Sequence, residues 1–141
     1  MNRILTLAAL IAIVTAFAHL SCIYIGPQCY RVQMAPTAII ESASKGTLLA
    51  PIGTIIVSSI FITFGCYALS AAKLIRKLPL LKTGVYSIAL LCVIRGLLPF
   101  QLWLCHPEKV SDLVLNVGFI WLLVGLLYFF GFKAVNSDNF T

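Results

Sequence analysis

The sequence predicts an all-helical integral membrane protein: a bundle of four transmembrane helices in a single membrane domain, residues 1–141. Hydrophobic residues make up 61% of the 141 residues and charged residues only 10%, whereas soluble domains carry about 45–50% and roughly 25%. A soluble chain of this length has too little interior to bury so much apolar surface. The apolar residues also fall into four long runs. The bilayer is therefore the expected solvent.

Each of the four runs is long enough to cross a bilayer once. A transmembrane helix needs about 20 mostly apolar residues, because the hydrocarbon core is ~30 Å thick and a helix rises ~1.5 Å per residue. Lipid offers no partner to free backbone groups, so the runs should be helices. They are too long and unbroken for barrel strands, which alternate and last about 10 residues. The expected spans are approximately 4–25, 51–72, 84–104 and 113–132.

The first run also permits a second interpretation, since a signal peptide begins in the same way. Arg3 precedes an apolar stretch, and residues 16–18 read Ala-Phe-Ala, which fits an A-x-A cleavage site. Cleavage there would leave three spans. The apolar run continues to Ile25, however, and is longer than an ordinary signal-peptide core. We therefore favour a retained first helix, with cleavage as the alternative.

The connection between the first two spans, residues 26–50, is the only long one. Pro36 suits the start of a short helix and Gly46 suits its end. Between them, three apolar residues share one helical face: Ile39, Ile40 and Ala43. We expect a short amphipathic helix in this first outer loop, lying flat on the lipid headgroups.

Basic residues in short loops predict the orientation, because they concentrate on the cytoplasmic side. One side of the bundle receives Arg3, Lys133 and the basic residues of the loop between spans two and three: Lys73, Arg76, Lys77 and Lys82. The other side receives only Arg31, Lys45 and Lys109. Both termini are therefore expected in the cytoplasm, in the inner membrane of a bacterial type of cell.

Several classes of function find no support in the sequence. The formal net charge is +6, but the ten Lys and Arg are scattered between the spans and form no basic face for nucleic acid. No zinc-protease motif, metal-spaced Cys/His cluster, phosphate-binding loop or nucleophile elbow occurs. His19 and His106 differ in depth, which disfavours a haem held by two imidazoles. We therefore expect no catalytic residue, metal or cofactor.

The positions of the acidic residues exclude one class of transporter. Small multidrug exporters also have four helices, but their proton exchange requires a carboxylate inside the membrane. Every acid of this chain lies outside the predicted spans: Glu41, Glu108, Asp112 and Asp138.

Five cysteines keep a redox enzyme as the alternative. Cys22, Cys29 and Cys105 lie on the predicted outer side, where disulfides can form. A membrane thiol or quinone redox enzyme could use them, although six residues separate the closest pair where a C-x-x-C would be expected. Architecture alone supports this analogy. The simpler interpretation is one structural bridge on the outer side and two buried thiols, Cys66 and Cys92.

Arg95 is the main candidate for a binding residue, because it lies near the middle of the third span. An arginine at a helix centre costs on the order of 2.5–3.5 kcal/mol on insertion scales and usually faces the bundle interior or a wet cavity. Gly96 permits close approach, and Pro99 frees the carbonyl of Arg95. The alternative is an arginine that snorkels or forms a structural pair.

Depth along the helices predicts the neighbours of Arg95. It lies about 14 Å below the outer end of its span at ~1.5 Å per residue, and an extended side chain reaches back toward the level of His19 and Asn116. The stripe of Ala8, Ala12 and Ala16 turns His19 toward another helix. Span two contributes Thr54, Ser58 and Ser59 at a similar depth. Glu41 is the acid best placed to join this polar layer, if the outer-loop helix folds inward instead of lying flat.

These residues predict a function without assigning a ligand. The expected ligand site consists of Arg95, His19, Asn116 and Glu41, in the outer half of the bundle. A lipid, a small amphiphile or an anion would suit such a site. Alternatively, the protein serves as a subunit of a larger membrane complex. Beyond the bilayer, the expected partners are another membrane protein or a small amphiphilic ligand, and not nucleic acid.

Overall fold

The computed structural model describes residues 3–137, and over this range all regular structure is helical. This confirms the predicted fold class. Asp138, one of the four acids, lies outside the described residues. The elements in chain order are α1 (Arg3–Ile25), α2 (Pro27–Val32), α3 (Thr37–Lys45), α4 (Leu49–Ala71), α5 (Leu81–Cys105), the short 3-10 helix η1 (Pro107–Lys109) and α6 (Asp112–Ser137).

The helices α1, α4, α5 and α6 are long and apolar enough to cross a membrane, and they coincide with the four predicted spans. Most of their ends agree with the prediction to within a few residues. The exception is α6, which continues to Ser137 although its apolar run stops at Phe132. Hydropathy marks where a helix leaves the hydrocarbon, whereas the backbone hydrogen bonds can continue beyond that level.

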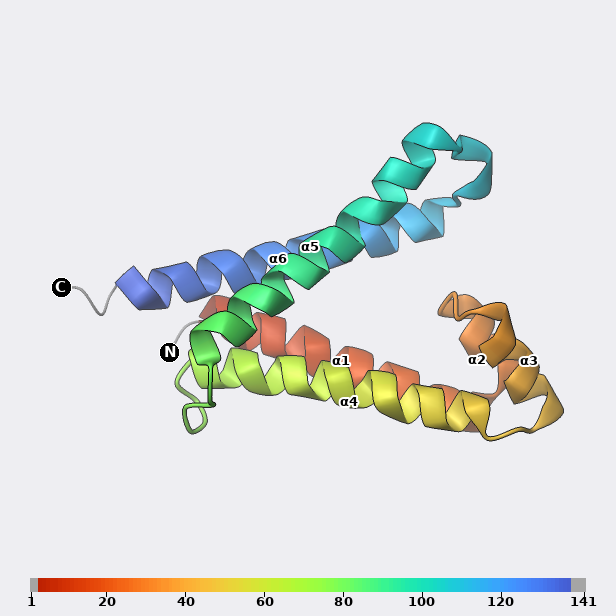
Figure 1. Ribbon diagram of the computed structural model, residues 1–141, viewed down its shortest axis with the longest axis horizontal. Helices are drawn as coiled ribbons and strands as arrows, with labels where there is room; N and C mark the ends of the chain where they lie inside the picture. The colour runs from red at the N-terminus through yellow and green to blue at the C-terminus, as the bar shows by residue number, and fades with distance from the viewer. Residues whose placement is uncertain (1–2, 138–141) are drawn as a thin grey trace. The chain divides into compact units, whose positions relative to one another are not determined.

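The connection between α1 and α4 holds two short helices where the sequence predicted one. Gly26 ends α1 with a φ of 88°, in the left-handed region, which glycine adopts without steric cost. Pro27 follows at the first position of α2, where its missing N–H is no loss. The chain therefore turns back over the end of α1 (Figure 1).

The second short helix, α3, has the predicted bounds but a different environment. Pro36 precedes it and Gly46 ends it in the left-handed conformation. Its apolar residues pack against a buried cluster of Cys22, Tyr30 and Ala50. The expectation that this face lies on lipid headgroups is therefore corrected: the apolar face covers the protein itself.

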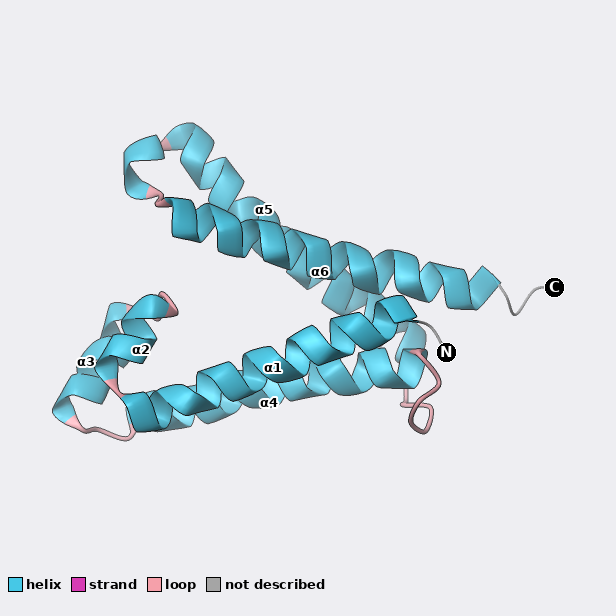
Figure 2. Cartoon of the chain, turned by 180° about the vertical axis from the view of Figure 1, so that it is seen from behind, coloured by secondary structure: helices cyan, strands magenta, loops and turns pink. Residues whose placement is uncertain are grey.

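The chain divides into two compact units, which are described one at a time. The first comprises residues 10–65: most of α1, all of α2 and α3, and most of α4. Figure 2 shows α1 and α4 lying side by side, with α2 and α3 at their connected end. Ser58 of α4 donates a hydrogen bond to the carbonyl of Ala16 at 3.2 Å, and Ala16 is fully buried. The predicted alanine stripe thus forms a helix contact.

The second unit contains residues 3–9 and 66–137, and its main feature is the α5–α6 pair. Glycine allows these two backbones to approach closely. A Cβ placed on Gly96 would lie 2.5 Å from the backbone nitrogen of Leu122 and 2.8 Å from the carbonyl oxygen of Gly118. A Cβ on Gly125 would lie 2.9 Å from the carbonyl oxygen of Ala89. Small residues at membrane helix contacts have this effect generally.

Candidate ligand-binding site

A disulfide between Cys22 and Cys29 ties the start of α2 to the end of α1. Cys22 is fully buried, and Cys29 is half-buried. The remaining three cysteines are free thiols: Cys66, Cys92 and Cys105. Two of the three cysteines expected on the outer side therefore form one bridge, as in the structural interpretation of the sequence.

A hydrogen bond between Tyr30 and Thr54 ties α2 to α4. The two hydroxyl oxygens lie 2.9 Å apart in a buried position. Thr54 also donates to the carbonyl of Ala50 at 2.7 Å. Because a threonine hydroxyl has a single hydrogen, Tyr30 must be the donor in the bond to Thr54. Together with the disulfide, this bond holds α2 against both long helices.

The loop between α3 and α4 is closed by Ser42. Its Oγ accepts a hydrogen bond from the backbone N–H of Ala50 at 2.8 Å, in the first turn of α4. The same hydroxyl lies 2.6 Å from the hydroxyl of Thr47. Ser42 thus satisfies one of the N–H groups that a helix start leaves unpaired, and it fixes α3 relative to α4.

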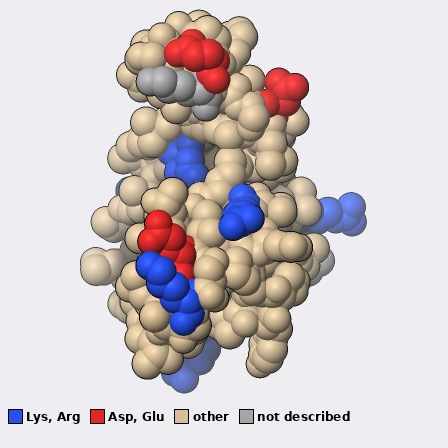
Figure 3. Space-filling view, turned by 90° about the vertical axis from the view of Figure 1, so that its right-hand side faces the viewer, with Lys and Arg blue, Asp and Glu red and all other residues tan. Residues whose placement is uncertain are grey.

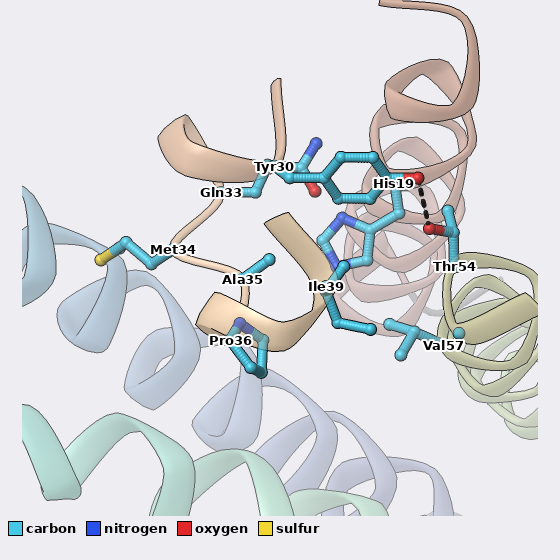
Figure 4. A pocket seen from close by; sticks show the side chains of 10 residues that line it. His19, Tyr30, Gln33, Met34, Ala35, Pro36, Ile39, Thr54 and Val57 are labelled. Atoms are coloured by element: carbon cyan, nitrogen blue, oxygen red, sulfur yellow. Dashed lines mark hydrogen bonds between the residues drawn. The ribbon is translucent and has the colours of Figure 1, made fainter. Parts of the chain in front are cut away.

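These attachments border a half-open cavity of about 400 Å³ between the two short helices and the helices α1 and α4 (Figure 4). Small-molecule sites commonly have such a volume, with mostly apolar walls and a few polar groups. The cavity is lined by His19, Tyr30, Gln33, Met34, Ala35, Pro36, Ile39, Gly53, Thr54 and Val57. A smaller cavity of about 170 Å³ lies near the start of α4, and Tyr30 lines both.

His19 is the residue of this cavity with unused hydrogen-bonding capacity. Its Nδ1 is buried and makes no well-directed hydrogen bond. The ring of Phe61 packs edge-on against the imidazole, with centroids 5.2 Å apart. Gln33 lies beside the ring (Figure 4) and donates from Nε2 to the carbonyl of Ala18 at 2.7 Å. The imidazole is therefore held in place by its neighbours while one nitrogen lacks a satisfied partner.

Of the four predicted ligand residues, His19 lines this cavity and Glu41 does not. Glu41 is exposed on α3 and forms an ion pair with Lys45 at 3.6 Å, with both side chains more than 60% exposed. Arg95 on α5 and Asn116 on α6 belong to the other unit, and both are exposed. Their predicted role in ligand binding is not tested by the structure and stays a prediction.

Sequence reasoning grouped Thr54 with His19, and both line this cavity, but it missed Tyr30 and Gln33. Both belong to α2, whose six residues are too few to show a helical periodicity. The signal available in the sequence was the Gly26-Pro27 pair, which can end one helix and start another.

Charged side chains are sparse around the end of α1 and α4 that carries α2 and α3. On the face drawn in Figure 3 they form small separate spots within an otherwise uncharged surface. Among the ten residues that line the cavity there is no lysine, arginine, aspartate or glutamate. No group of His, Cys, Asp and Glu within residues 3–137 is arranged to hold a metal ion.

The fold and the cavity define a multi-pass membrane protein with four membrane-spanning helices and an apolar site at one end of two of them. Comparison with protein families, with curated proteins and with solved structures finds no match to this chain.

Proposed function

We propose that this protein binds a small amphiphile in the cavity beneath α2 and α3. The single observation that carries the proposal is a cavity of about 400 Å³ whose walls are apolar except for a few fixed polar groups, with the unsatisfied imidazole of His19 among them. An amphiphile suits such walls, because its tail replaces apolar contacts and its head can satisfy a polar group.

The depth of the cavity supports an amphiphile over a water-soluble ligand. His19 lies six positions before the end of α1 and Thr54 five positions after the start of α4. At ~1.5 Å per residue these positions lie roughly 8–9 Å below the helix ends. Helices of 23 residues are about 35 Å long and cross a hydrocarbon core of ~30 Å, so this depth lies inside the acyl chains, just below the headgroups. An amphiphile from the bilayer has its tail at this level and its head just above it.

The orientation in the membrane is part of the proposal. The excess of basic residues beside the termini and in the loop between α4 and α5 favours the cytoplasm for that side. The Cys22–Cys29 disulfide independently favours an oxidising compartment for the opposite side. We propose that the chain lies in a cell inner membrane, with both termini cytoplasmic and the cavity on the outer side.

Photolabelling tests the proposed ligand site directly. The protein in lipid nanodiscs is irradiated with a decanol analogue that carries a photoreactive diazirine in its tail, and the labelled peptides are identified by mass spectrometry. We expect label on residues 30–39 and 53–57. Ala35→Phe should remove most of this label, because Ala35 lines the cavity and a phenyl ring would fill it.

Ala38→Phe is the matched control, since Ala38 is exposed on α3 and lines no part of the cavity. It should label like the wild type. Equal labelling of wild type and Ala35→Phe would contradict the proposal, as would label spread evenly over the lipid-facing residues of all four long helices.

The redox alternative has one observation in its favour, namely that Cys22 and Cys29 are paired. Complete burial of Cys22 leaves only the half-buried Cys29 open to attack, which disfavours thiol exchange, since exchange requires access to a sulfur. Thiol counting with reductant distinguishes the two functions: a buried structural bridge leaves three free thiols in the folded protein and gives five only in denaturant, whereas a redox disulfide gives five in the folded protein as well. Reversible exchange of this disulfide with an added quinone would favour the redox enzyme.

A further inference from the structure

The walls of the cavity indicate that its ligand has no charge. The cavity offers no lysine, arginine, aspartate or glutamate side chain to pair with an ion. The charged side chains of α2 and α3 are exposed, namely Arg31 and the Glu41–Lys45 pair. Because burial of an unpaired ion is strongly unfavourable, a sulfate, phosphate or carboxylate head would lose more hydration than the cavity returns.

The hydroxyl hydrogens in the cavity wall are already used within the protein. Thr54 donates to the carbonyl of Ala50, and Tyr30 donates to Thr54. Neither hydroxyl therefore has a hydrogen to offer to a ligand.

Gln33 constrains the protonation of His19. Its amide nitrogen donates to the carbonyl of Ala18 at 2.7 Å and approaches the sulfur of Cys29 at 3.6 Å. Both amide hydrogens are thus engaged. Figure 4 shows the side chain of Gln33 beside the imidazole, and with both amide hydrogens engaged only its carbonyl oxygen is left to face the ring. The Gln33 carbonyl oxygen is an acceptor, so it favours the His19 tautomer that carries its hydrogen on the nearer ring nitrogen.

The buried ring nitrogen is Nδ1, which leaves Nε2 for the cavity. A neutral imidazole carries one hydrogen, and its other nitrogen is an acceptor. With the hydrogen on Nδ1, facing the Gln33 carbonyl without a well-directed bond to it, Nε2 presents a lone pair. A ligand that satisfies this nitrogen must bring a donor.

We infer that the amphiphile bound in this cavity has an uncharged head that donates a hydroxyl hydrogen to His19, as an alcohol or a phenol does. This inference rests on the proposed function and narrows it to a class of ligand. An ether or ketone of the same size can fill the cavity but leaves Nε2 unpaired. His19 and Gln33 together would decide the preference: His19 accepts the hydrogen bond, and Gln33 fixes the tautomer that can accept it.

A competition series tests the inference with one tail and different heads. Decanol, decyl methyl ether and decyl sulfate are titrated against photolabelling of the cavity in nanodiscs, each with its partition into protein-free nanodiscs measured in parallel. We expect decanol to compete about 5- to 10-fold better than the ether, the value of one neutral hydrogen bond. Decyl sulfate should compete at least about 100-fold less well.

Two variants test whether the preference for a hydroxyl head depends on His19 and Gln33 or only on filling of the cavity. His19→Phe keeps an aromatic ring against Phe61 but removes the acceptor, so alcohol and ether should compete equally. Gln33→Leu frees the imidazole to adopt either tautomer, so decan-2-one should gain on decanol while the variant still binds both. Ser44→Ala, on the exposed side of α3, is the control and should keep the wild-type preference.

The outcomes distinguish the inference from the proposed function. If all the probes fail to compete with labelling at the cavity, the cavity is not an amphiphile site and both ideas fail. If decanol and the ether compete equally in the wild type, or if decyl sulfate competes as well as decanol, the hydroxyl inference fails and the amphiphile site stands. A Gln33→Leu variant with an unchanged alcohol-to-ketone ratio would also overturn the role given to Gln33.

Discussion

The two units of this chain join their helices by different physical means. In residues 10–65, short helices are attached by a disulfide and by buried side-chain hydrogen bonds, including that from Tyr30 to Thr54. In the α5–α6 pair, helix contact depends on glycines that have no side chain to separate the backbones. One region uses specific polar bonds at a few points, and the other uses close packing along its length.

This difference bears on how a cavity persists beside α2 and α3. Glycine-mediated packing brings two helices into contact and leaves little space between them. Attachment at separate points can hold a short helix away from its neighbours, so a space of ligand size persists. The comparison predicts that added volume damages the α5–α6 pair most, whereas loss of single bonds damages residues 10–65 most.

The largest effect is expected from Gly96→Ala. The added Cβ would meet the backbone nitrogen of Leu122 at 2.5 Å, and a backbone atom can move only if the helices separate. We expect a loss of about 3 kcal/mol of stability, measured by reversible unfolding in mixed micelles. Gly53→Ala is the matched control, since its Cβ would meet only the side-chain tip of Ile39 at 3.3 Å.

Gly53→Ala should change stability by less than about 1 kcal/mol, because the better helix propensity of alanine offsets a small adjustment of Ile39. If both glycine variants lost equal stability, the proposed contrast between the two regions would be wrong.

The next effect is expected when the disulfide is removed. Cys22→Ala together with Cys29→Ala should lower the stability of the α2 segment by about 2–3 kcal/mol, the value for so short a closed loop. Hydrogen exchange of residues 26–35 should accelerate while α5 and α6 stay unchanged. Cys105→Ala, at an exposed free thiol, is the control. Acceleration throughout the chain would show that the bridge has a global role.

A smaller effect is expected from the loss of one hydroxyl at Ser42. Ser42→Ala removes the acceptor for the backbone N–H of Ala50 and should lower stability by about 1 kcal/mol. Ser44→Ala is the control, because its hydroxyl is exposed and bonds only to the carbonyl of Ile40 in its own helix. Unfolding of both variants side by side measures the difference, and equal midpoints would exclude a capping role for Ser42.

The smallest effect is expected from Arg95→Leu, and it decides between two hypotheses. The position of Arg95 within its span predicts a ligand residue, in which case the variant would lose binding. Because Arg95 lines no part of the cavity, we expect decanol competition to change by less than about twofold. A tenfold or larger loss of decanol competition would support Arg95 as a ligand-binding residue. Asn116→Ala in the same assay tests the second residue of that hypothesis.

The sequence was sufficient for the four spans and for α3, because long apolar runs and the Pro36 and Gly46 signals are local properties of the chain. It was not sufficient for the cavity. The course of α2 depends on the φ of Gly26 and on the choice of Cys29 as the partner of Cys22. Both are settled by tertiary packing, so depth along a helix found His19 and Thr54 but could not find Tyr30.

The position of Tyr30 has a consequence for the size of molecule that the proposed site could accept. Its ring lines the cavity of about 400 Å³ and also the one of about 170 Å³, so it stands as a partition between them. One hydrogen bond to Thr54 fixes that partition. A change as small as Thr54→Val would release the hydroxyl that keeps the ring in place, and the two spaces could then be filled together. For the proposed amphiphile, the upper limit on length would thereby depend on a single hydroxyl on a different helix.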